Sequence, residues 1–162
     1  MIKQQTIQNS VVTVGVGLHT GQKVKLTLKP APQNHGIVFC RTDLSTPMKI
    51  QVSPNIVQDT KLCSAIGTAE FKIATVEHLM SALSALGIDN ILIEVNGAEL
   101  PIMDGSSISF IYLIKSAGIE EQIAPKQFVF IKEAIVATDG DKVAKFEPYP
   151  GFMIDFTIDF PH

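Results

Sequence analysis

The sequence predicts an α+β fold, in which a β-sheet carries two helices, followed by the first strands of a second, similar domain. Strand-like patterns occupy most of the first seventy residues, two helix-like patterns follow, and strand-like patterns begin again after residue 126. Of the 162 residues, 46% are hydrophobic and 18% charged, which suits a buried core. We therefore expect a two-layer domain over residues 1–125, then a linker and the opening strands of an incomplete second domain over residues 126–162.

The first strands are predicted by β-branched residues and by alternation. Residues 11–16 are rich in valine, and residues 23–29 alternate apolar and polar side chains as a half-buried strand does. Pro30 and Pro32 end this second segment, and residues 36–40 predict the next strand.

Residues 75–86 predict a short amphipathic helix. At 100° per residue, five apolar side chains fall on one narrow arc: Val76, Leu79, Met80, Leu83 and Leu86. Thr75 is the predicted N-cap, and Gly87 is the predicted stop. Glu77 and His78 lie off the apolar arc, so the core requires neither of them.

The predicted strand at residues 91–95 alternates, and the turn at 96–97 follows it. A second helix is expected at about residues 107–117, ended by Gly118. Its apolar residues occupy more than one face, so we expect it to be largely buried. Residues 119–126 have the character of a linker.

The end of the chain echoes its beginning. Gly21-Gln-Lys-Val24 with a later Pro30 is matched by Gly140-Asp-Lys-Val143 with a later Pro148, either by chance or because a second unit of the same kind begins there. Residues 154–162 form an apolar strand-like segment without a closing helix. This pattern predicts that the chain is part of a longer protein.

Composition and charge exclude several classes of protein. The net charge is −3 without a Lys/Arg cluster, which disfavours a nucleic-acid surface. No apolar run reaches the roughly 18 residues of a membrane span, and the first residues lack the apolar segment of a signal peptide. Cys40 and Cys63 form neither a CxxC pair nor a disulfide framework. We expect a cytoplasmic protein without a membrane span.

Glu77 and His78 are the first candidates for chemistry. At a helix N-terminus the positive end of the dipole favours an ionised Glu77 and a neutral His78, which suit a proton acceptor and a metal ligand. A catalytic zinc needs three protein ligands and a base, and no second histidine follows at helical spacing. A solvated glutamate beside a surface histidine is the alternative interpretation.

Three other side chains allow more than one interpretation. His19 lies in a glycine-flanked loop, residues 15–21, where either a functional or a structural role fits. His35 lies in a turn and is expected to face solvent. Cys63 could be a nucleophile, although a lone cysteine beside leucine is more often a small buried hydrophobe.

Seven segments stand in order along essentially the whole chain: Gly15-Val-Gly-Leu-His-Thr-Gly21, Arg41-Thr-Asp43, Thr75-Val-Glu-His-Leu79, Leu86-Gly-Ile-Asp-Asn90, Glu94-Val-Asn96, Pro101-Ile-Met-Asp-Gly-Ser106 and Asp155-Phe-Thr-Ile-Asp-Phe160. Together they resemble the zinc-dependent UDP-3-O-acyl-N-acetylglucosamine deacetylases of lipid A biosynthesis in Gram-negative bacteria. That family is roughly twice as long as this chain and has two similar α+β domains, so the resemblance covers its first domain and the opening of its second.

The resemblance implies catalytic roles for the pair at the first helix. His78 corresponds to a zinc ligand, and Glu77 to the general base that activates the metal-bound water for removal of the N-acetyl group. The remaining zinc ligands of the family and its catalytic histidine acid would lie beyond residue 162. The resemblance therefore predicts that residues 1–162 alone neither bind zinc tightly nor deacetylate the substrate.

The resemblance also implies substrate-binding positions. Leu62 and Cys63 would line the active-site entrance, and His19 would lie close to the active site. The uridine diphosphate end would contact three further residues: Lys142, Asp159 and Phe160. The full-length enzyme is expected to be a monomer. The alternative is a non-catalytic binding or regulatory module that retains only the first domain.

Overall fold

The structure is a computed structural model that describes residues 1–68 and 70–159. The chain divides into two compact units, the first Met1–Lys126 and the second starting at Gln127, and each is described by itself. The expectation that the second unit opens a domain similar to the first stays a prediction.

A five-stranded mixed sheet is the centre of the first unit. The strand order is β2-β3-β9-β4-β5; the pairs are antiparallel except β4 with β9, which is parallel. Two predicted strands, at 11–16 and 91–95, are confirmed, and the other two predictions differ by one residue. The bounds are β2 Val11–Val16, β3 Lys23–Pro30, β4 Ile37–Arg41, β5 Met48–Gln51 and β9 Ile91–Val95.

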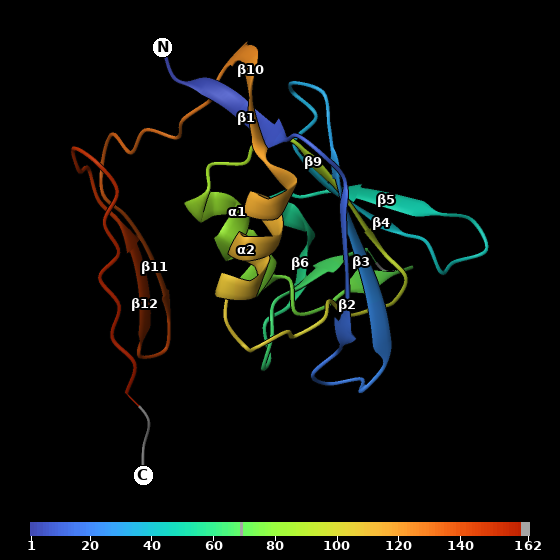
Figure 1. The fold of residues 1–162 in the computed structure, drawn as a ribbon. Coiled ribbons are helices and arrows are strands. Elements are labelled where there is room, and N and C mark those ends of the chain that lie inside the picture. Colours follow the sequence, from blue (N-terminus) through green and yellow to red (C-terminus); the bar gives the residue numbers. More distant parts are fainter. Residues whose placement is uncertain (69, 160–162) are drawn as a thin grey trace. The chain divides into compact units, whose positions relative to one another are not determined.

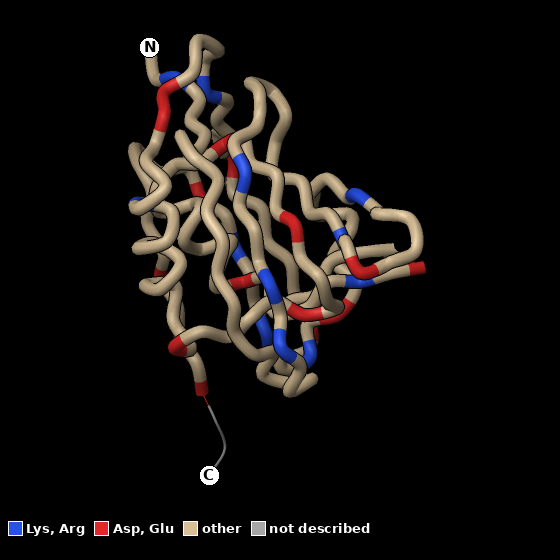
Figure 2. The backbone as a smooth tube through the Cα atoms, turned by 45° about the vertical axis from the view of Figure 1, so that its right-hand side comes forward, with Lys and Arg blue, Asp and Glu red and all other residues tan. Residues whose placement is uncertain are grey.

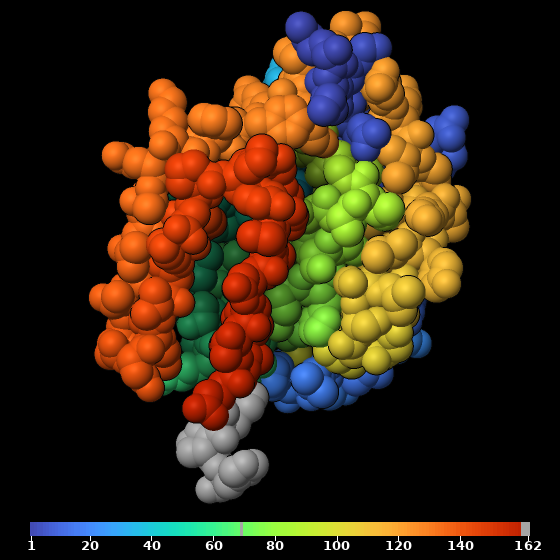
Figure 3. All heavy atoms as spheres, turned by 90° about the vertical axis from the view of Figure 1, so that its left-hand side faces the viewer, coloured from blue at the N-terminus to red at the C-terminus, as the bar shows by residue number. Residues whose placement is uncertain are grey.

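Two helices, α1 Glu77–Ala85 and α2 Ile108–Ala117, lie side by side on one face of this sheet (Figures 1 and 3). The alternation in β3 turns Leu26 toward the helices, where it is fully buried together with Leu83 of α1 and Phe110 of α2. The predicted α+β fold is therefore confirmed: the core lies between one sheet and two helices.

The second helix is less buried than predicted. Phe110, Ile114 and Ala117 are buried, whereas Ile108 is 48% and Tyr112 68% exposed. Only one face of α2 packs against α1 and β2. A short helix on a single sheet buries one stripe, even when apolar residues extend beyond it.

The prediction of a linker after α2 is wrong. Residues Ile119–Pro125 form β10, which pairs antiparallel with the N-terminal strand β1, Lys3–Ile7. Most side chains of β10 are exposed or half-buried, so alternation gives a weak signal there. Backbone pairing with a strand more than a hundred residues away creates this element.

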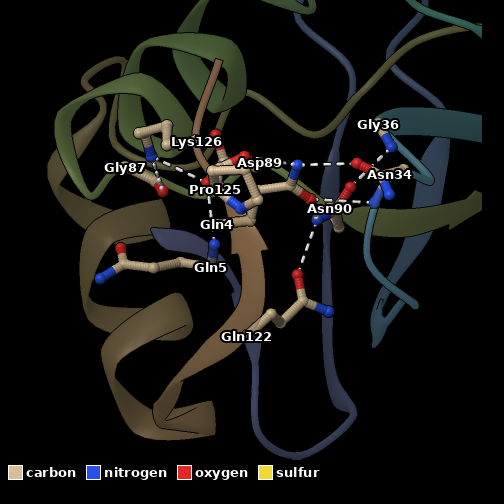
Figure 4. Close-up of polar contacts among 10 residues, drawn as sticks. All are labelled: Gln4, Gln5, Asn34, Gly36, Gly87, Asp89, Asn90, Gln122, Pro125 and Lys126. Atoms are coloured by element: carbon tan, nitrogen blue, oxygen red, sulfur yellow. Dashed lines mark hydrogen bonds and ion pairs between the residues drawn. The ribbon is translucent and has the colours of Figure 1, made fainter. Parts of the chain in front are cut away.

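A buried amide network attaches this two-stranded sheet to the rest of the first unit (Figure 4). Asn90 Nδ2 donates to Gln4 Oε1 at 2.8 Å and to Gln122 Oε1 at 2.6 Å, and Asn90 Oδ1 accepts from the backbone N–H of Gly36 at 2.8 Å. Asn90 is 2% exposed. One side chain therefore connects β1, β10 and the start of β4.

The strands of the five-stranded sheet carry charged residues of both signs (Figure 2). Lys29 Nζ on β3 lies 2.7 Å from Glu94 Oε1 on β9, and both side chains remain partly exposed. Because both groups are in contact with solvent, such a surface pair contributes about 1 kcal/mol or less to stability.

A small three-stranded sheet lies next to the start of α1 in the sequence. It contains β6 Val57–Asp59, β7 Ala65–Gly67 and β8 Lys72–Ile73, after a single 3₁₀ turn at Pro54–Ile56. The loop between β6 and β7 includes Leu62 and Cys63.

The part of the second unit that the structure describes contains one β-hairpin, β11 Ile135–Asp139 and β12 Lys142–Phe146. Its turn uses Gly140 at φ 61°, as the turn before β3 uses Gly21 at φ 63°. The two echoed sequences thus have the same local role, while the repeat itself stays a prediction.

The apolar strand expected at the end of the chain is not observed over residues 152–159. These residues run alongside the hairpin without pairing as a strand (Figures 1 and 3). A strand requires a hydrogen-bonding neighbour, and within the described part of the second unit β11 and β12 pair only with each other. Among the described residues, no helix is long and apolar enough to cross a membrane.

Candidate functional site

The candidate site begins where α1 begins. The prediction that Thr75 is the N-cap is wrong: the capping position is Val76, without a side-chain hydrogen bond, and Thr75 adopts φ 59°. The Thr75 hydroxyl instead donates to Glu99 Oε1 at 3.1 Å. The predicted stop is confirmed, since Gly87 follows the C-cap at φ 68°.

Glu77 and His78 occupy the first turn of α1, and both are half-buried. Leu79 and Leu83 on the same helix are fully buried, which confirms that the pair lies off the core face. The backbone N–H of Ser64 donates to Glu77 Oε2 at 3.0 Å. This hydrogen bond orients one carboxylate oxygen and leaves the other oxygen to accept a further proton donor.

The Ser64 contact brings the β6–β7 loop beside Glu77. Leu62 in this loop is 91% exposed at φ 62°, and Cys63 is half-buried. The backbone thus places both predicted entrance residues within two positions of a direct partner of Glu77. Their contact with substrate stays a prediction.

His19 lies in the loop between β2 and β3, with its side chain exposed. Its backbone N–H donates to Glu99 Oε1 at 2.9 Å, the same oxygen that accepts from Thr75. The N–H of Thr20 donates to Glu99 Oε2 at 2.8 Å. One carboxylate therefore connects the His19 loop to the residue that precedes Val76.

Glu99 was missed by the sequence interpretation, although it is 1% exposed. Burial acts to raise the pKa of this carboxyl, but hydrogen bonds from the His19 and Thr20 N–H groups and from the Thr75 hydroxyl prevail and lower it. The group is therefore an ionised acceptor inside the domain. The local sequence around it is a turn followed by proline, which gives no sign of this role.

The residues present match part of a zinc centre. His78 offers one imidazole, and Glu77 offers a carboxylate beside it. Within residues 1–68 and 70–159, no three His, Cys, Asp or Glu side chains converge in a way that could hold a metal ion. A catalytic zinc requires three protein ligands, so this pair cannot form such a centre by itself, and the roles of His78 and Glu77 stay predictions.

The predicted nucleotide-binding residues belong to the second unit. Lys142 opens β12 opposite Asp139 and is exposed, and Asp159 is exposed after the hairpin. Phe160 lies outside the described residues. The roles of these three positions stay predictions.

The second unit also has an apolar cavity of about 840 Å³ that the sequence interpretation did not identify. It is lined by residues 128–131, 145–147 and 149–155. Phe130 and Phe152 are among the lining side chains and are 78% and 85% exposed. An open apolar surface of this kind is typical of a surface that receives another apolar group.

A two-layer α+β domain with an oriented carboxylate and an imidazole at a helix start defines one part of a candidate hydrolase site. Residues 4–162 match the family described as LpxC: UDP-3-O-acyl N-acetylglycosamine deacetylase, and the chain belongs to this family.

Relatives in several bacteria are similar over the whole chain. The UDP-3-O-acyl-N-acetylglucosamine deacetylases of Pasteurella multocida (strain Pm70) and Haemophilus influenzae (strain PittEE) are 55% and 56% identical to it, with 100% of this chain and 53% of each relative covered. The enzyme of that name from Xanthomonas oryzae pv. oryzae (strain PXO99A) is 51% identical, with 54% of its length covered. The chain thus spans about half the length of the curated relatives it matches.

Proposed function

We propose that this chain is the N-terminal part of a zinc-dependent deacetylase that removes the N-acetyl group from UDP-3-O-acyl-N-acetylglucosamine, the committed step of lipid A biosynthesis. The observation that carries the proposal is the placement of Glu77: its carboxylate is oriented by the Ser64 N–H at 3.0 Å, next to His78, in a chain of this family. The names of the relatives supply the substrate.

In this proposal His78 is a zinc ligand, and the other ligands and a general acid come from residues outside this chain. When bound, zinc lowers the pKa of a coordinated water to about 7. Glu77 accepts one proton of the attacking water through the oxygen that Ser64 leaves free. The water oxygen bonds to the acetyl carbonyl carbon, the carbon–nitrogen bond breaks, and the sugar nitrogen takes a proton to become the amine.

The start of α1 supports this role of Glu77. Glu77 and His78 both lie in the first turn of α1, and the Ser64 N–H holds one oxygen of the Glu77 carboxylate at 3.0 Å. The first unit thus presents a carboxylate and an imidazole at the same helix start. Leu62, Cys63 and His19 would border the entrance.

We propose that the second unit binds the uridine diphosphate end of the substrate. Lys142 would pair with the diphosphate, and Asp159 and Phe160 would contact the uridine. We further propose that the complete enzyme is a monomer and that it acts in the cytoplasm.

The test replaces Glu77 in the complete enzyme that carries this chain. Glu77→Gln keeps the size of the side chain and removes the base, so kcat is expected to fall by about 10²–10⁴-fold while bound zinc stays near the wild-type amount. His78→Ala is expected to lower both kcat and bound zinc.

Glu120→Gln is the matched control, because Glu120 is an exposed carboxylate on β10. It should leave both kcat and zinc content unchanged. Turnover by Glu77→Gln at the wild-type rate would contradict the assignment of the base. The 162-residue chain alone is expected to show neither tight zinc binding nor deacetylation, and activity of that chain would refute the need for outside ligands.

A further inference from the structure

The backbone is strained at Thr75, two residues before the candidate base Glu77. Thr75 adopts φ 59°, a left-handed conformation that β-branched residues rarely adopt. Such conformations persist where the surrounding structure fixes them, and they are frequent at active sites. Here the conformation directs the chain from β8 into the first turn of α1, two residues before Glu77.

Backbone hydrogen bonds fix this segment on both sides. Ala74 N–H donates to Ala98 O at 2.9 Å, and Leu100 N–H donates to Ala74 O at 3.0 Å. Val76 N–H donates to Ser64 O at 3.2 Å. Residues 98–100 therefore run parallel to the backbone at Ala74, which places Glu99 beside Thr75.

The Glu99 carboxylate accepts three hydrogen bonds within the first unit. Oε1 accepts from the Thr75 hydroxyl at 3.1 Å and from His19 N–H at 2.9 Å, and Oε2 accepts from Thr20 N–H at 2.8 Å. All three partners are donors, which suits a carboxylate because it has only acceptors. An amide of the same shape would turn a donor toward one of them.

The fit between the carboxylate and the loop is close. A Cβ placed on Gly17 would lie 2.4 Å from Glu99 Oε2 and 2.4 Å from Thr20 Oγ1. A side chain at this position would displace either the carboxylate or the loop. The loop of His19 is thus shaped around Glu99, independently of the Thr75 hydrogen bond.

We infer that Glu99 is a positioning residue: it holds Thr75 in its left-handed conformation and the His19 loop in place, and so fixes the start of α1, where Glu77 and His78 lie. Glu99 acts through these residues and does not touch the reacting atoms. The effect on turnover rests on the proposed function, whereas the effect on geometry does not.

The kinetic test uses Glu99→Gln in the complete enzyme. The substitution keeps the volume but sets an amide N–H against a backbone N–H, so we expect kcat to fall by about 10–100-fold through misplacement of the base. The substitution does not alter the nucleotide-binding residues proposed in the second unit, so KM should change by less than about threefold. The control is Glu94→Gln, a partly exposed carboxylate on β9 that pairs with Lys29; it should leave kcat unchanged.

A second pair of variants tests the Thr75 bond without altering Glu99. Thr75→Val removes the hydroxyl and keeps the branched shape, and it should lower kcat. Thr75→Ser retains the hydroxyl and should recover most of the lost rate. A merely structural role would lower the melting temperature in these variants with kcat unchanged at temperatures where the protein is folded, and that result would overturn the inference.

The geometric test uses amide NMR of the 162-residue chain and needs no activity. In Glu99→Gln the amide resonances of His19, Thr20 and Glu77 should shift, and the first two should exchange faster with solvent, while the amides of β4 and β5 stay in place. Unchanged His19 and Glu77 resonances would overturn the inference. If the complete wild-type enzyme does not deacetylate the substrate, the proposed function fails, and this NMR result still decides the role of Glu99.

Discussion

Phenylalanine side chains are buried in the first unit and exposed in the described part of the second. In the first unit Phe39, Phe71 and Phe110 are 0%, 7% and 1% exposed. In the second, Phe128, Phe130, Phe146, Phe152 and Phe156 are all between 63% and 85% exposed. The first unit has a sheet and two helices that face each other, whereas the described part of the second has a single two-stranded sheet.

This difference shows that a second layer, rather than apolar composition, makes a core. A hairpin alone has no partner for its apolar face and is at best marginally stable in water. In the first unit, the helices provide that partner and bury Leu26, Leu83 and Ile114 completely. We therefore expect the free energy of unfolding to reside almost entirely in the first unit.

The largest expected effect comes from opening a cavity in the core of the first unit. Leu83→Ala in the 162-residue chain should lower the free energy of unfolding by about 2–5 kcal/mol, because Leu83 is fully buried between α1 and the sheet. Phe130→Ala in the second unit removes a larger side chain but should change it by about 0.5 kcal/mol or less. Urea unfolding followed by circular dichroism measures both values.

The comparison between the units would be contradicted if Phe130→Ala lowered the free energy of unfolding as much as Leu83→Ala does. That outcome would mean that the aromatic side chains of the second unit contribute to the cooperative core. A loss of less than about 1 kcal/mol in Leu83→Ala would equally contradict the assignment of the core.

A smaller effect is expected from the amide network of the first unit (Figure 4). Asn90→Ala leaves the Gly36 N–H and two amide oxygens without their partner in a buried place, so it should cost about 1–3 kcal/mol. The control is Asn96→Ala, which removes an exposed hydrogen bond to Lys25 N–H that water can replace, at a cost of less than about 1 kcal/mol. Equal losses in the two variants would show that burial of this network adds no stability.

The sequence predicted the parts of the fold that depend on local pattern. Residues 91–95 and 11–16 are strands with the predicted bounds because alternation or β-branching runs through the whole segment. The pattern failed at 119–125, where exposed and half-buried side chains alternate weakly and a distant partner, β1, makes the strand. It failed again after Gly151, where apolar residues have no strand to pair with.

The site was predictable only in part for the same reason. Helical phase placed Glu77 and His78 off the core face, and the structure confirms this. Thr75 was assigned as a cap from its residue type, but its left-handed backbone is set by Glu99 and by residues 98–100. Contacts between segments some twenty to eighty residues apart leave no local periodicity, so Glu99 could not be found from the sequence.

The smallest expected effect is the sharpest test of the comparison between the units. A chain that ends at Lys126 keeps β10 and the ammonium of Lys126, which donates to Gly87 O and to Asp89 Oδ2, both at 2.8 Å. Its free energy of unfolding should equal that of the 162-residue chain within about 0.5 kcal/mol, since the core is complete.

The matched control for this truncation is a chain that ends at Gly118. It lacks β10, so β1 loses the strand with which it pairs and Asn90 loses Gln122. Its free energy of unfolding should be lower than that of the chain ending at Lys126 by several times about 0.5 kcal/mol. The reason is that buried backbone groups of β1 lose their hydrogen bonds. If the chain ending at Lys126 unfolds as readily as the one ending at Gly118, the first unit does not fold by itself. Stability would then depend on the residues from Gln127 onward, although the aromatic side chains described there are exposed.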